Sequence, residues 1–154
     1  MSNEETKPNP EEKPLTKREE LQRKRDALRA ELEKAEAVQE EIDLEEILKL
    51  EIEHGVENVT VVKGLFVPGC VTRVASRTPS PEEIKRYRHR VKPKKLGDVP
   101  NSQDAAAELA AVTRIYPNLE AWEKILRARP GVDTQLGQQA VALAVGEEEA
   151  EGKD

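Results

Sequence analysis

The sequence predicts a mainly α-helical protein with a small β-hairpin or meander, an α+β fold in which a long charged N-terminal helix precedes a small helical domain. Three observations support this fold class. Residues 16–43 are highly charged and lack glycine and proline, residues 56–75 are rich in valine and threonine, and residues 78–146 contain apolar stretches separated by turn signals. With 36% charged residues among 154 and a single phenylalanine, the chain has little apolar material, so we expect a small core.

The first part of the chain is predicted to be a disordered segment followed by a long charged helix. Residues 1–15 are polar and contain three prolines, so they lack the side chains that a core needs. Thr16 can cap a helix and Glu19 completes a capping box, so we expect the helix over residues 16–43. Its apolar residues recur mostly every seven positions, at Leu21, Leu28, Leu32, Ala35 and Ile42. Polar residues interrupt this stripe, which leaves three alternatives open: a partner-docking arm, a self-associating coiled coil and a solvated helix.

A small α+β domain is predicted over residues 44–146. Asp43 followed by Glu46 repeats the capping pattern, which indicates a second helix, and Gly55 ends that helix. Residues 56–75 contain two glycine turn signals between apolar stretches, so they predict two or three short strands. A ribbon of this size must pack its apolar side on a helix to be stable.

The second half of the chain is predicted to be helical. Ser80 can cap a helix, Pro81 suits the first turn and Glu83 completes a capping box, so we expect a helix over residues 81–91. Three more helices are expected over residues 104–115, from Asn118 to Pro130, and from a cap at Asp133 to Gly146. The last residues, 147–154, are acidic and predict a mobile tail.

The predicted core depends on few aromatic residues. One buried aromatic side chain contributes about 150–250 Å² of area, so we expect Trp122, the only tryptophan, to be core rather than an exposed binding residue. The predicted core residues are Leu44, Ile47, Leu48, Phe66, Ile84, Tyr87, Tyr116, Leu119, Trp122, Ile125, Leu126, Leu136 and Val141. The only cysteine, Cys70, is expected to be a buried or half-buried apolar residue.

Charge is distributed in three blocks. There are 18 acidic and 10 basic residues within 1–57, 3 and 10 within 58–100, and 10 and 5 within 101–154. The basic block is densest over residues 85–95, which could bind acidic protein surfaces, bind phosphates, or form a solvated face. We rank protein above nucleic acid as a partner because only Tyr87 interleaves with these cations. The candidate partner-binding residues are Leu21, Leu28, Leu32, Lys85, Arg86, Arg88, Arg90 and Lys92.

The sequence carries no recognisable catalytic or cofactor-binding pattern. His54 and His89 lack carboxylates or cysteines at ligand spacing, so we expect both on the surface and no metal site. There is no glycine-rich phosphate loop and no paired nucleophile and histidine, so we expect no enzyme, no cofactor and no small-molecule substrate. We also expect no secretory signal and no membrane span, because the start is polar and no run approaches about 20 apolar residues.

Several short motifs follow one another within residues 44–146. They are the E-H-G end of a helix at Glu53–Gly55, a small β-ribbon, the helix entry T-P-S-P-E-E-I-K-R-Y-R at Thr78–Arg88, an alanine-rich helix, Tyr116-Pro117, an apolar helix, R-P-G at Arg129–Gly131, and a last helix with Leu-Gly that ends in Gly146. In this order and spacing, the chain resembles the tail assembly chaperones of long-tailed bacteriophages and prophages. The helix over residues 16–42 and the lysine-rich residues 92–95 depart from the pattern of that family.

The resemblance implies a non-enzymatic protein of the bacterial host cytoplasm that is absent from the mature virion. Such a protein binds and solubilises the tape measure protein and helps to recruit tail tube subunits. Family members often make a longer product by ribosomal slippage, and codons for Gly152-Lys153 could form a slippery run, so an extended form is a further hypothesis. Two alternatives remain: a structural virion or adaptor protein, and a nucleic-acid-binding module that uses residues 85–95.

Overall fold

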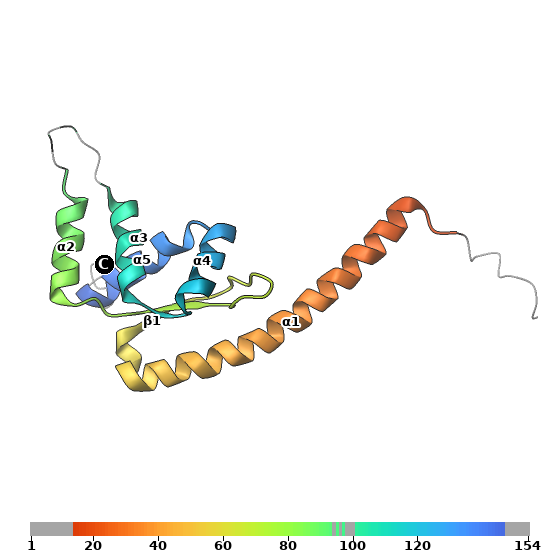
Figure 1. The fold of residues 1–154 in the computed structure, drawn as a ribbon, viewed down its shortest axis with the longest axis horizontal. Coiled ribbons are helices and arrows are strands. Elements are labelled where there is room, and N and C mark those ends of the chain that lie inside the picture. The colour runs from red at the N-terminus through yellow and green to blue at the C-terminus, as the bar shows by residue number, and fades with distance from the viewer. Residues whose placement is uncertain (1–13, 94, 96, 98–100, 147–154) are drawn as a thin grey trace, which may run out of the picture. The chain divides into compact units, whose positions relative to one another are not determined.

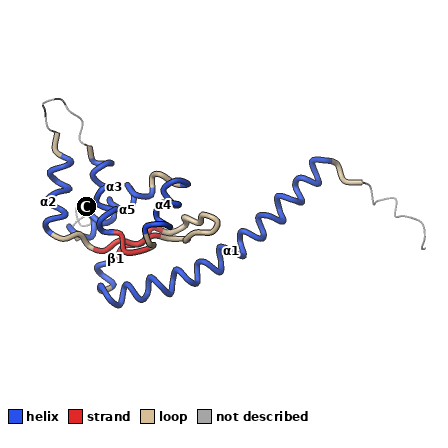
Figure 2. Tube along the Cα trace, in the orientation of Figure 1, coloured by secondary structure: helices blue, strands red, loops and turns tan. Residues whose placement is uncertain are grey.

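The computed structural model describes residues 14–93, 95, 97 and 101–146. Its elements are α1 (Lys17–His54), the short 3-10 helix η2 (Val56–Asn58), β1 (Val59–Val62), β2 (Val74–Arg77), α2 (Pro81–Val91), α3 (Ser102–Thr113), β3 (Arg114–Tyr116), α4 (Leu119–Ala128) and α5 (Val132–Val145) (Figures 1 and 2). The predicted mainly helical fold with a small sheet and a long N-terminal helix is therefore confirmed. The acidic tail, the slippage position and most of the predicted N-terminal disorder lie outside the described residues.

The chain forms two compact units, Met1–Ala35 and Glu36–Asp154, and α1 contributes residues to both. Thr16 Oγ1 accepts a hydrogen bond from the backbone N–H of Glu19 at 3.2 Å, as the capping pattern predicts. The prediction of a second helix that begins at Asp43 is wrong, since α1 continues to His54. No glycine or proline interrupts the sequence there, so nothing local ends the helix.

The sheet has the order β1-β2-β3 and is antiparallel throughout. β1 pairs with β2 so that Val62 lies opposite Val74, while Ala75 of β2 lies opposite Tyr116 of β3. The third strand was not predicted, because the helix expected over residues 104–115 ends at Thr113 and the next three residues join the sheet. Long-range pairing of this kind leaves no local pattern in the sequence.

Helices α3 and α5 pack together over the sheet (Figure 1). The main core cluster combines the strands and their connecting loop with α3, α4 and α5, and its buried members are Val62, Leu65, Cys70, Val71, Val74, Ala110, Trp122, Ile125, Val132 and Leu136. A second cluster joins α2, α3 and α5 through Ile84, Leu109 and Ala140. The burial of Trp122 and of Cys70 confirms both predictions.

The helix ends follow local signals at α2 and α4. Ser80 Oγ accepts from the N–H of Glu83 at 3.2 Å while the Glu83 carboxylate accepts from the N–H of Ser80 at 2.8 Å, so the predicted capping box is confirmed. The Asn118 side chain likewise accepts from the N–H of Ala121 at 2.9 Å. The predicted cap at Asp133 is wrong, because Gly131 is the N-cap and Asp133 lies inside the first turn of α5.

Burial separates the predicted core residues into three groups. Ile47, Ile84, Trp122, Ile125 and Leu136 are buried. Phe66, Tyr87, Tyr116, Leu126 and Val141 are half-buried. The prediction is wrong for Leu44, Leu48 and Leu119, which are 37%, 56% and 58% exposed. The buried face of α1 is centred on Asp43 and Ile47, so Leu44 lies at its margin and Leu48 beyond it, and α4 turns Trp122 rather than Leu119 toward the core.

A buried carboxylate holds the second part of α1 against the sheet and its loop. Asp43 is fully buried, and its Oδ2 accepts from the N–H and the hydroxyl of Thr72, both at 2.6 Å. Its Oδ1 accepts from Gln39 Nε2 at 2.9 Å and from the hydroxyl of Tyr116. Burial, and then the hydrogen bond to Asp43, raises the pKa of Tyr116, so this phenol remains a donor at neutral pH. Four donors therefore replace the water that the carboxylate loses.

Candidate protein-docking surface

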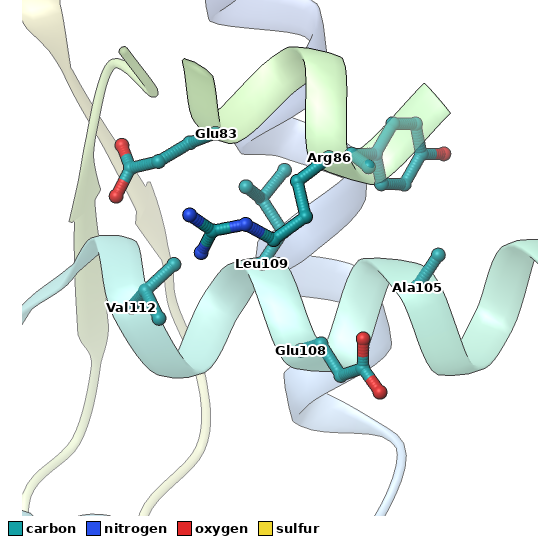
Figure 3. A pocket seen from close by; sticks show the side chains of 7 residues that line it. Glu83, Arg86, Ala105, Glu108, Leu109 and Val112 are labelled. Atoms are coloured by element: carbon teal, nitrogen blue, oxygen red, sulfur yellow. The ribbon is translucent and has the colours of Figure 1, made fainter. Parts of the chain in front are cut away.

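Helices α2 and α3 lie side by side and enclose a hollow of about 150 Å³ (Figure 3). It is lined by Glu83, Arg86 and Tyr87 from α2 and by Ala105, Glu108, Leu109 and Val112 from α3. Leu109 is 4% exposed and belongs to the floor, whereas Val112 is 50% exposed and stands at the edge. The hollow is therefore apolar inside and open to solvent.

The size of the hollow limits what it can hold. Sites for drug-sized molecules enclose about 300–1,000 Å³. A cavity of about 150 Å³ takes a group of benzene size, which is also the size of one large aliphatic or aromatic side chain. The hollow therefore suits a single anchoring side chain better than a cofactor.

The two carboxylates on the edge of the hollow are already neutralised by arginines. Arg77 donates two hydrogen bonds to Glu83, at 2.7 and 2.9 Å, and the pair lowers the pKa of the Glu83 carboxyl to about 2. Arg90 lies 3.0 Å from Glu108. Arg90 was predicted to bind a partner, but in the structure its guanidinium pairs with Glu108 of the same chain.

A positive patch, which we call the α2 patch, is formed by three cations of α2, Lys85, Arg86 and Arg88, and by Lys92 just after its end. All four side chains are exposed, and none makes an ion pair with another described residue. Arg86 also lines the hollow and reaches from α2 toward α3 (Figure 3). Of the four, only Arg86 lines the hollow. At about 3.6 residues per turn, Lys85, Arg88 and Lys92 face away from the side of α2 that carries Glu83 and Tyr87.

The other three predicted partner-binding residues lie in the first unit. Leu21, Leu28 and Leu32 are 56%, 60% and 44% exposed, and every residue from Thr16 to Ala35 is exposed. These three leucines are accessible to a partner and form a separate candidate surface within the first unit.

Metal-ligating and thiol side chains are two further candidates for a chemical role in the described part of the chain. Among the described residues, no group of three or more histidine, cysteine or acidic side chains could hold a metal ion. Cys70 is buried and its Sγ donates to the Ala121 carbonyl at 3.3 Å, so the thiol packs in the core. Within the described part of the chain, no helix is both long and apolar enough to cross a membrane.

The sequence did not predict the hollow. The alanine-rich helix α3 packs closely on α5. The side of α3 that lines the hollow carries Ala105, Glu108, Leu109 and Val112, and this set of residues does not signal a recess. No known protein family matches the chain, and no curated protein or solved structure matches it.

Proposed function

We propose that this chain is a non-enzymatic tail assembly chaperone that binds and solubilises the tape measure protein of a long-tailed phage or prophage and helps to recruit tail tube subunits. The observation that carries the proposal is the apolar hollow between α2 and α3, which Arg86 borders. A partner helix with an aliphatic anchor and an acidic neighbour fits such a surface, because its anchor enters the recess while its carboxylate meets Arg86. The motif order within residues 44–146 supports the choice of family.

Co-expression with the tape measure protein tests this function. The soluble fraction of the tape measure protein should rise when the chain is present, and it should fall back with the double variant Val112→Gln and Arg86→Ala. Leu119→Gln is a matched control, since Leu119 is an exposed apolar residue on α4 rather than at the hollow. A tape measure protein that is no more soluble with the wild-type chain than without it would reject the proposal.

The proposed location is the host cytoplasm during assembly, with no copy in the finished particle. Mass spectrometry of purified particles separates this function from that of a structural virion or adaptor protein. Stoichiometric amounts of the chain in mature particles would favour the structural alternative.

The α2 patch also favours a second candidate, nucleic-acid binding. Four exposed cations on α2 and just after its end could contact phosphates, and affinity would then fall steeply with salt. Gel retardation of DNA and RNA at low salt tests this candidate, and the absence of any retardation would reject it.

A further inference from the structure

An apolar line with a seven-residue repeat runs along α1 and is exposed to solvent. Its members are Leu21, Leu28, Ala35 and Ile42, and Ile42, at the far end, is 49% exposed. Helices in proteins gain most of their stability from packing an apolar face, because a short helix alone is marginal in water. A seven-residue apolar repeat is typical of helices that pair with each other. We call these four residues the α1 seam.

The side chains that flank the α1 seam change sign along the helix. The first seam residue, Leu21, has four cations at spacings of three and four, which are Lys17, Arg18, Lys24 and Arg25. Three of these cations border a shallow depression at Leu21. The last seam residue, Ile42, is followed at the same spacings by Glu45 and Glu46. The seam therefore has a basic end and an acidic end.

The charges at both ends are available to a partner. Lys17 and Arg18 make no ion pair with another described residue. The carboxylates of Glu45 and Glu46 lie 3.9 and 3.2 Å from Lys49, and these three side chains are between 47% and 74% exposed. Exposed pairs of this kind contribute little to stability, so they can exchange for a new partner.

We propose that two copies of the chain pair through the α1 seam in antiparallel orientation. In this register Leu21 of one copy lies opposite Ile42 of the other, and Leu28 lies opposite Ala35. Each large side chain at Leu28 then faces a small one, as facing positions in a packed core do. The contact is two-fold symmetric and uses the same surface on both copies, so association ends at the dimer.

Charge complementarity is the reason for the antiparallel orientation. In the proposed register the basic end of each seam meets the acidic end of the other, so that Lys17 and Arg18 lie opposite Glu45 and Glu46. A parallel pair would bring together the basic ends of both copies and the acidic ends of both copies. Like charges in contact oppose association, so the parallel pair is disfavoured.

Sedimentation equilibrium of the full-length chain over a range of concentrations tests the pairing. The average mass should rise to that of a dimer and remain there. High salt should weaken the association, since salt screens exposed charge pairs. Leu28→Gln should weaken it roughly tenfold, because it places an amide in the seam. Leu119→Gln changes a similarly exposed leucine on α4 and should have no effect.

Charge variants test the orientation. Lys17→Glu with Arg18→Glu, and separately Glu45→Lys with Glu46→Lys, should each weaken association roughly tenfold, because like charges then face each other. All four substitutions in one chain should restore association, because each end again meets its opposite. This fourfold variant also keeps the net charge of the wild type. In a parallel pair neither twofold variant would weaken association, since like charges already face each other there.

The distance between the two copies gives a second readout of orientation. A spin label on Gln22→Cys should lie about 28 Å from the label of the other copy along an antiparallel pair, because a helix rises about 1.5 Å per residue. In a parallel pair the two helices would hold the labels only about 10 Å apart. Cys70 is buried, so the wild-type chain serves as the labelling control.

Two controls exclude trivial causes. Lys124→Glu with Arg127→Glu makes the same change of net charge as Lys17→Glu with Arg18→Glu, at exposed sites on α4, and should associate like the wild type. Circular dichroism of every variant checks that the helices remain. A wild-type chain that stays monomeric, a fourfold variant that does not recover, or labels about 10 Å apart would overturn the antiparallel pairing.

Discussion

The two sides of α3 are packed very differently, although both are built from small and aliphatic residues. Toward α5, the backbone of Ala106 comes so close to Gly137 that a Cβ on the glycine would lie 1.9 Å from the Ala106 carbonyl oxygen. Toward α2, the same helix leaves a hollow above Leu109. Close packing is therefore found where Ala106 meets Gly137. The side of α3 that faces α2 carries Ala105, Glu108, Leu109 and Val112 and leaves a recess.

The largest expected effect comes from the closely packed side. Gly137→Ala would place a methyl group against the Ala106 backbone, which cannot move aside without separating α3 from α5, so we expect a loss of about 3 kcal/mol or more. Urea unfolding measures the loss. Gly131→Ala is the matched control, since its Cβ would meet nothing within 4 Å, and it should change the stability by less than about 0.5 kcal/mol. Equal stability of the two variants would contradict the close approach of the helices.

The floor and the edge of the hollow should differ in their contribution to stability. Leu109 is buried between α2, α3 and α5, so Leu109→Ala should cost about 2–4 kcal/mol. Val112 is half exposed at the edge, so Val112→Ala should cost about 0.5 kcal/mol or less. Thermal unfolding of both variants makes the comparison. Similar losses would mean that the edge is part of the core.

The pair of Glu83 and Arg77 should make the α2 side sensitive to acid. The folded pKa of Glu83 is about 2, below the ordinary 4.5, so its contribution is complete above about pH 5 and is lost as the pH falls toward 2. Because Arg77 is partly exposed, we expect about 1–2 kcal/mol at neutral pH. Glu83→Gln should remove this amount at pH 7 and little at pH 2. If the difference in free energy of unfolding between wild type and Glu83→Gln does not decrease in acid, this role of the ion pair is contradicted. Glu82→Gln, in the same turn but exposed, is the control.

The smallest effect on stability is expected at the surface of the α2 patch. Arg88→Ala should change the free energy of unfolding by no more than about 0.5 kcal/mol, because the side chain is exposed and has no ion-pair partner among the described residues. It should still weaken binding of an acidic partner helix, measurable by titration calorimetry at low salt. Unchanged binding would confine the docking surface to the hollow itself.

The sequence predicted best what is decided within a few residues. The start of α2 follows from Ser80, Pro81 and Glu83, which are adjacent in sequence and satisfy the first turn of the helix. Asp43 carries a similar local pattern but serves partners 29 and 73 residues away, so the same reasoning failed there. The strand at Arg114–Tyr116 was missed for the same physical reason, since its partner is β2.

The candidate site was only partly predictable. The cations Lys85, Arg86, Arg88 and Lys92 were identified because net charge can be read from the chain directly. The hollow, which only Arg86 of these four borders, depends on the spacing between α2 and α3, and no local pattern in the sequence sets that spacing. The sequence likewise did not predict that Leu48 is exposed, because a periodic apolar pattern does not show which of two helix faces packs against the core.

The hydrogen bonds of Asp43 cannot all form until translation has reached Tyr116. The carboxylate is synthesised early, whereas its donor Tyr116 follows 73 residues later. At about 5–20 residues per second, a ribosome needs about 4–15 s to supply that phenol. During this interval α1 lacks one of the four donors to its buried carboxylate, so the contact between α1 and β3 can form only after translation has passed Tyr116.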